Sequence, residues 1–102
     1  MPDILETKVN AHANICLALN EIYCRKNSDY NDFFGKSFEE YGMAMPCIRL
    51  EDKLNRLKAL TVHSKKQNVN DESVADTLID MANYAIMTLI EMNLNKEEQA
   101  NG

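Results

Sequence analysis

The segment 71–92, DESVADTLIDMANYAIMTLIEM, constrains this chain most, because its apolar residues cover most of the circumference of a long helix. One narrow polar stripe interrupts that surface. Glu72, Asp76, Asp80 and Asn83 form the stripe, within about 80° of one another at 100° per residue. The three acids follow at i, i+4 and i+8, so they are neighbours of like charge that repel each other. Such a row needs a metal cation, or Arg and Lys side chains, to balance it, and the stripe is therefore our first candidate site. The alternative is a solvated face.

The apolar arc of the same helix is wider than one small chain can cover. It spans about 160–180°, whereas a surface helix buries roughly 100°. We therefore expect a homo-oligomer in which this helix packs against another subunit and completes a four-helix bundle or a larger one. The alternative is a compact monomer in which an aromatic loop covers the excess. The arc comprises Val74, Ala75, Leu78, Ile79, Met81, Ala82, Ala85, Ile86 and Leu89.

Composition narrows the class of protein. The 102 residues fit a single domain, 1–102, and the net charge of −5 argues against a surface that binds DNA or RNA polymers. Cys16, Cys24 and Cys47 form no CxxC pair. The start, MPDILETK, lacks the pattern of a signal peptide, and no apolar run is long enough to span a membrane. We expect a cytoplasmic protein with reduced thiols.

Two more segments have a helical pattern. The first covers residues 4–25, with Asp3 as its N-cap and Glu6 completing a capping box. The second begins near Pro46 and runs to about residue 63 or 65, because proline suits the start of a helix. The expected apolar faces are Leu5, Val9, Cys16, Leu19, Ile22 and Tyr23 on the first, and Cys47, Leu50, Leu54, Leu57 and Thr61 on the second.

Segment 26–42 lies between these helices and holds turn-forming residues with five of the seven aromatic residues. We expect a short helical turn at about 33–41, with its aromatic side chains packed on the long helices. A polar connection at 65–69 leads to Asn70 or Asp71 as the cap of the last helix, and the polar tail at about 94–102 is expected to fray. The predicted fold is all-α, with three long helices and a short helical loop.

The sequence RLEDKLNR carries a second candidate site. Arg49, Asp52 and Arg56 lie within about 60° of one another on a helix, with Lys53 alongside. The planar guanidinium group suits phosphate, so two Arg and a Lys could bind the phosphates of a nucleotide. The alternative is an intrahelical ladder in which Asp52 pairs with Arg56.

Two smaller groups have weaker chemical signals. Lys26, Asp29 and Tyr30 could stack and hold a base, or the aromatic ring could simply pack in the core. His12 and Cys16 stand at i and i+4, a spacing that can ligate zinc, but a structural zinc site needs four ligands and no second pair is evident. The alternative for these two is a buried structural pair.

The order KNSDYNDFF, SFEEYG, RLEDKLNRLKAL and VNDESVADTLIDMANYAIMTL resembles the family called nucleotide modification associated domain 1, found in phages and bacteria. That family in turn resembles the all-α, MazG-type nucleotide pyrophosphohydrolases. The resemblance implies an oligomeric helical bundle whose acidic helices hold Mg²⁺ around the phosphates of a nucleotide. In MazG-like enzymes water attacks between the α- and β-phosphates and yields a nucleoside monophosphate and pyrophosphate.

Carried over residue by residue, the resemblance places Asp80 and Asn83 at the ExxD pair of the later helix, with Asp76 one turn before. Glu51 and Asp52 would be the contribution of the earlier helix. The chain departs from the pattern: Leu54, not an acid, follows three residues after Glu51, and the later pair is Asp-x-x-Asn.

Three functions follow from these readings. The resemblance implies a Mg²⁺-dependent nucleoside triphosphate pyrophosphohydrolase, with Glu51, Asp76, Asp80 and Asn83 as metal ligands. The reduced number of acids favours a nucleotide-binding oligomer without hydrolysis, which in a phage could sequester a signalling nucleotide, such as a cyclic one, and counter host antiviral defence. In a purely structural oligomer the polar stripes would only set the alignment of the helices.

Overall fold

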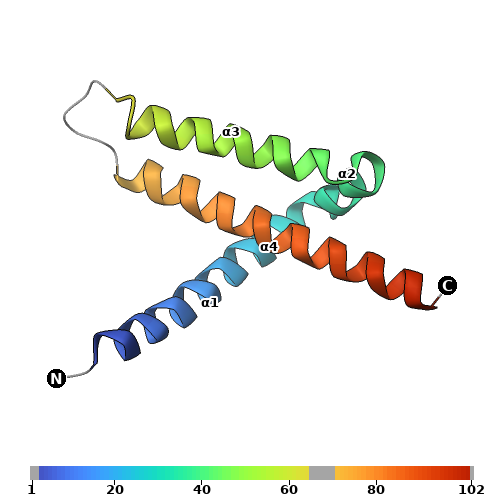
Figure 1. Ribbon diagram of the computed structural model, residues 1–102, viewed down its shortest axis with the longest axis horizontal. Coiled ribbons are helices and arrows are strands. Elements are labelled where there is room, and N and C mark those ends of the chain that lie inside the picture. Colours follow the sequence, from blue (N-terminus) through green and yellow to red (C-terminus); the bar gives the residue numbers. More distant parts are fainter. Residues whose placement is uncertain (1–2, 65–70, 102) are drawn as a thin grey trace. The chain divides into compact units, whose positions relative to one another are not determined.

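The computed structural model describes residues 3–64 and 71–101, without the side chains at 28–30, 71 and 99–101. The described residues form four helices and no strand: α1 (Ile4–Tyr30), α2 (Phe33–Tyr41), α3 (Ala44–Leu60) and α4 (Asp71–Asn101) (Figure 1). The all-α prediction is therefore confirmed. The chain divides into two compact units, Met1–Asp32 and Phe33–Gly102.

The first unit is built on α1. Its N-cap is Asp3, as predicted, and a carboxylate oxygen of Asp3 accepts a hydrogen bond from the backbone N–H of Leu5 at 3.1 Å. The helix continues to Tyr30, so the predicted end at residue 25 is wrong. Asn31 and Asp32 stop it, because both have positive φ, a conformation that Asn and Asp adopt more readily than most residues.

The second unit begins with α2, and the predicted turn at 33–41 is confirmed as a helix over those residues. Gly42 ends α2. Its N–H donates to the carbonyl of Phe38 at 2.7 Å, and its φ of 65° is the left-handed conformation that glycine adopts without strain. The chain then turns directly into α3.

Helix α3 begins at Ala44, near the predicted start, but Pro46 is its third residue and not its first. Proline is accommodated inside the first turn because the first four N–H groups of a helix have no intrahelical partner. The helix ends at Leu60, earlier than predicted. There the hydroxyl and the N–H of Thr61 donate to the carbonyl of Leu57, at 2.6 and 3.0 Å.

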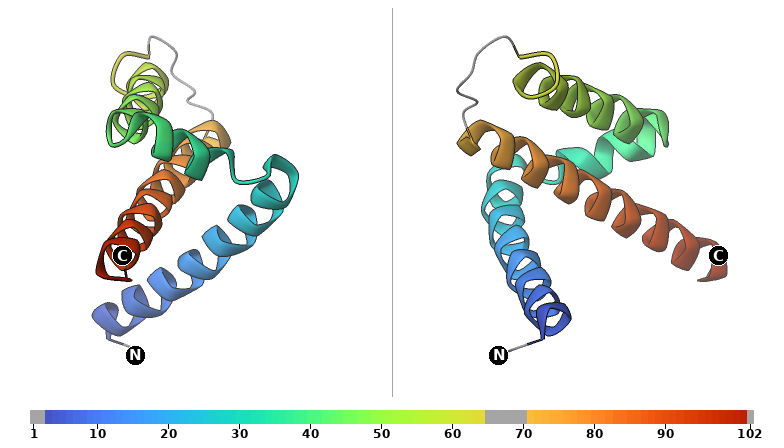
Figure 2. Two further views of the ribbon diagram at one scale, coloured as in Figure 1. Left: turned by 90° about the vertical axis from the view of Figure 1, so that its right-hand side faces the viewer. Right: turned by 60° about the vertical axis from the view of Figure 1, so that its left-hand side comes forward.

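Helices α3 and α4 lie side by side as an antiparallel hairpin (Figures 1 and 2). The side of α3 that faces α4 differs from the predicted apolar face. Leu50 and Leu57 are partly buried as expected, but Cys47 and Leu54 are exposed, and Lys53 is partly buried in place of Leu54. The predicted end of the last helix at residue 92 is also wrong, since α4 runs to Asn101. The predicted connection at 65–69 and the Asn70 cap lie outside the described residues.

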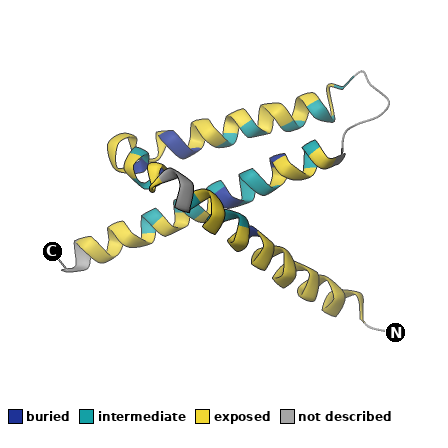
Figure 3. Ribbon diagram, turned by 180° about the vertical axis from the view of Figure 1, so that it is seen from behind, coloured by how far each residue is buried: buried dark blue, intermediate teal, exposed yellow. Residues whose placement is uncertain are grey.

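The apolar core of this unit lies where α2, α3 and α4 meet, and Figure 3 shows buried positions at this end of α3. Aromatic packing is only partly as predicted, because Phe33 and Tyr41 are exposed. The buried members of the core are Phe34, Phe38 and Met45, and Tyr84, Met87 and Met92 of α4 pack against them.

Helix α4 presents a mixed polar and apolar row to α3 and leaves part of its apolar arc exposed. Thr77 is 2% exposed, whereas Leu78 and Leu89 are 49% and 58% exposed. In the part of the chain that the structure describes, no helix is long and apolar enough to cross a membrane.

Candidate functional site

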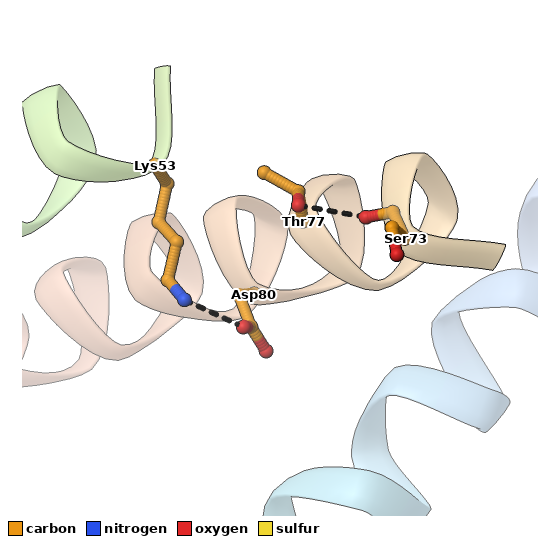
Figure 4. Close-up of polar contacts among 4 residues, drawn as sticks. All are labelled: Lys53, Ser73, Thr77 and Asp80. Carbon is orange, nitrogen blue, oxygen red and sulfur yellow. Dashed lines mark hydrogen bonds and ion pairs between the residues drawn. The ribbon is translucent and has the colours of Figure 1, made fainter. Parts of the chain in front are cut away.

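One ion pair joins the two candidate sites. The Nζ atom of Lys53 on α3 lies 3.0 Å from Oδ2 of Asp80 on α4, and the two side chains are 27% and 26% exposed (Figure 4). The sequence assigned Lys53 to a phosphate-binding group and Asp80 to a metal-binding group. The structure brings the two groups together at this contact, with water reaching only part of each side chain.

A second contact between the helices fixes an arginine. The guanidinium carbon of Arg49 lies 5.9 Å from the centre of the Tyr84 ring, and Nε of Arg49 lies 3.2 Å from Sδ of Met45. Phe34 supports the other partner, since its ring stacks on Tyr84 with centroids 6.1 Å apart and planes inclined by 15°. Arg49 is itself an exposed residue, so solvent reaches its side chain although Tyr84 and Met45 contact it.

These two contacts also define the alignment of the hairpin. Arg49 precedes Lys53 by four residues, and Tyr84 follows Asp80 by four, so the contacts lie one turn apart on each helix. An anion that bound Arg49 would therefore approach the helices one turn away from the Lys53–Asp80 pair.

Ser73 and Thr77 also lie in this region, and no role for either was predicted from the sequence. Thr77 is almost fully buried, and its hydroxyl donates to the carbonyl of Ser73 at 2.7 Å (Figure 4). The sequence does contain a signal for them. Ser73, Thr77, Asp80 and Tyr84 are spaced by 4, 3 and 4 residues, the spacing of a helix that packs on one neighbour. The wide apolar arc on other sides of α4 obscures that row.

The remaining predicted nucleotide-binding residues lie on α3 and in the first unit. Asp52 and Arg56 are exposed on α3. Lys26 is exposed on α1, in the other unit. The side chains of Asp29 and Tyr30 lie outside the described residues.

The remaining predicted metal ligands differ in burial. Asp76 and Glu51 are exposed, and Asn83 is 9% exposed. Glu51 lies about 160° around α3 from Lys53, so one chain does not bring it next to Asp80. Among the described residues, no three His, Cys, Asp or Glu side chains cluster as they would around a metal ion. The metal assignment of these residues stays a prediction.

The fold and the contacts thus define an all-α protein whose candidate site lies on a helical hairpin with paired opposite charges. The model of the family described as nucleotide modification associated domain 1 matches residues 26–92, which contain α2, α3 and most of α4. The chain belongs to that family, as the sequence motifs predicted. No curated protein and no solved structure matches the chain significantly.

Proposed function

We propose that the protein binds a nucleotide through its phosphates at the α3–α4 hairpin and acts in nucleotide metabolism. The observation that supports this best is the placement of Arg49, held by Tyr84 and Met45 but exposed, one turn from the Lys53–Asp80 pair. An arginine whose position is fixed loses less conformational entropy when it binds phosphate. The family to which the chain belongs supports the nucleotide as the ligand class.

The chemistry of each group suits a phosphate. The guanidinium fork of Arg49 can donate two parallel hydrogen bonds to phosphate oxygens. Lys53 carries three N–H donors, so a phosphate oxygen can accept from one while Asp80 accepts from another. Asp80 then keeps Lys53 oriented, and because the pair is neutral overall, it does not repel an anion that Arg49 binds.

We further propose that the bound nucleotide is a triphosphate hydrolysed with Mg²⁺, as the MazG-like resemblance implies. Asp76 and Asp80, one turn apart on α4, offer the one or two carboxylates that Mg²⁺ takes beside phosphate oxygens, and both are at least partly exposed. When bound, Mg²⁺ would act as a Lewis acid on the phosphates. Arg49 and Lys53 would stabilise the negative charge that develops as water displaces pyrophosphate from the α-phosphorus.

A second function is favoured by the Lys53–Asp80 contact itself. Lys53 already neutralises Asp80, which leaves Asp76 as the nearest acid on that stripe for a metal. A hairpin of this kind would retain an intact nucleotide and sequester it, for instance a cyclic dinucleotide used as a signal.

We propose in addition that the protein is a homo-oligomer assembled through the outer face of α4. Leu78, Ile86 and Leu89 are large and exposed there, and they belong to the arc that is too wide for one chain. A second copy would bury these side chains and complete a four-helix bundle from two hairpins.

The test is incubation of the purified protein with nucleoside triphosphates and cyclic dinucleotides, with and without Mg²⁺. Chromatography then identifies products, and denaturation releases any nucleotide that was retained. Monophosphate and pyrophosphate that form only with Mg²⁺, and are lost in Asp80→Asn, would support the hydrolase. Retained intact nucleotide would support sequestration, and a protein that neither retains nor converts any nucleotide would refute both functions.

A matched pair of variants tests the binding residues. Arg49→Ala should weaken nucleotide binding about tenfold or more, because a hydrogen bond to a charged group contributes about 1.5–3 kcal/mol. Lys58→Ala removes another exposed cation, from the last turn of α3, and should leave affinity unchanged. Equal affinities of these two variants would show that Arg49 does not contact the phosphates.

A further inference from the structure

The first unit contains two side chains that can ligate a metal and that take no part in the proposed nucleotide site. Sγ of Cys16 lies 3.7 Å from Nδ1 of His12 on the next turn of α1. Both residues are exposed, so the interpretation of them as a buried structural pair is wrong. Both lie before residue 26, where the match to the family begins.

The separation of the two atoms suits a shared metal ion. Zinc binds thiolate sulfur at about 2.3 Å and imidazole nitrogen at about 2.0–2.1 Å, and the tetrahedral angle then sets the sulfur and nitrogen about 3.6 Å apart. The observed 3.7 Å therefore needs almost no rearrangement of either side chain. One chain supplies two ligands, whereas a closed zinc site has four.

The neighbours of this pair indicate where the other two ligands come from. Leu5, Val9, His12 and Cys16 follow one another at intervals of 4, 3 and 4 residues, which is the spacing of contact positions in a two-stranded coiled coil. Leu5 and Val9 are 68% and 67% exposed. A second α1 packed along this edge, parallel and in register, would cover both and would bring its own His12 and Cys16 to the same level.

We propose that α1 helices of two copies pack along this edge and that their His12 and Cys16 side chains together hold one Zn²⁺ ion. Each cysteine binds as thiolate and each histidine as neutral imidazole, so binding of one ion releases two thiol protons to solvent. The two copies are held together by the metal and by Leu5 and Val9, which precede it on the same edge. This site is independent of the nucleotide site proposed for the hairpin.

The test is titration of the reduced, full-length protein with Zn²⁺ in the presence of a competing chelator, followed by measurement of bound metal per chain. We expect one ion per two chains. Co²⁺ in place of Zn²⁺ should give the intense visible absorption of a tetrahedral site and the charge-transfer band of a thiolate ligand. Both signals should be absent in Cys16→Ser and strongly reduced in His12→Ala.

Matched controls separate the proposed site from general thiol chemistry. Cys24 and Cys47 are also free and exposed, so Cys24→Ser and Cys47→Ser should bind the metal as the parent does. Circular dichroism of His12→Ala should show unchanged helix content, since alanine is the better helix former. No bound zinc, one ion per chain, or undiminished binding by Cys16→Ser would overturn the proposal.

Discussion

An ion pair between Lys53 and Asp80 joins α3 to α4, with Nζ and Oδ2 3.0 Å apart and each side chain about three-quarters buried. A shift of one helix by a turn would move the partners about 5.4 Å apart along the axis. The pair therefore favours one alignment of the hairpin over its neighbours, and the same pair lies at the proposed nucleotide site.

Removal of the ion pair should destabilise the hairpin modestly. In a double-mutant cycle with Lys53→Met and Asp80→Asn, we expect a coupling free energy of about 0.5–1 kcal/mol, because solvent still screens the partly exposed charges. Chemical denaturation of the four proteins measures it, and the cycle cancels the other contacts of Asp80. The coupling should fall at high salt. A coupling of zero at low salt would mean that the pair does not form in solution.

The burial of Thr77 makes its substitutions sensitive to size. Thr77→Val keeps the shape and leaves no polar group unsatisfied, so the free energy of unfolding should change by less than about 1 kcal/mol. Thr77→Leu adds volume at a site that is 2% exposed and should cost about 1–3 kcal/mol. Thermal unfolding of both variants makes the comparison. A stable Thr77→Leu protein would show that α4 is loosely packed there.

Position 42 requires glycine because of its backbone conformation, and not because a larger side chain would fail to fit. A Cβ atom placed on it meets nothing within 4 Å, but its φ is +65°. Gly42→Ala should therefore destabilise the protein by about 1–2 kcal/mol, and Gly42→Asn by less, since Asn tolerates this region better. Denaturant titration measures both. Equal stability of the alanine variant would contradict the left-handed turn between α2 and α3.

The proposed assembly through α4 should be sensitive to charge on its outer face. Leu89→Glu places a charge on that face and should convert the oligomer to monomers in analytical ultracentrifugation, run with a zinc chelator so that the site proposed on α1 cannot link two copies. Ile48→Glu is the control, because Ile48 is similarly exposed but lies on α3. With the chelator present, a parent protein that sediments as a monomer, or an oligomer that withstands Leu89→Glu, would exclude this interface.

The helices could be predicted from the sequence wherever side-chain spacing and backbone preference agreed. The bounds of α2 follow from Phe34 and Phe38, four residues apart, and from Gly42 as a stop. The end of α1 was missed because residues 26–30 hold Asn, Ser and Asp, which are weak helix formers but do not break a helix. The actual stop is the positive φ of Asn31 and Asp32, which composition does not reveal.

The candidate site was only partly predictable, since the sequence does not say which side of α3 faces α4. On a helix, either Lys53 or Leu54 can share a face with Leu50 and Leu57, because both spacings fit the helical repeat. The structure turns Lys53 inward, where its aliphatic chain can lie along the apolar surface while its ammonium group reaches Asp80. The contact of Arg49 with Tyr84 depends on the same alignment of the two helices, so the spacing of residues in the sequence could not predict it either.

The different lengths of α3 and α4, 17 and 31 residues, have a practical consequence for handling the protein. From Asp80 to Asn101 the chain is continuous helix, and a rise of 1.5 Å per residue makes that distance roughly 30 Å. The far end of α4 thus works as a built-in spacer. An affinity tag or fluorophore attached at that end of the helix would be carried well away from Lys53 and Asp80, so it would not crowd the proposed site in binding measurements.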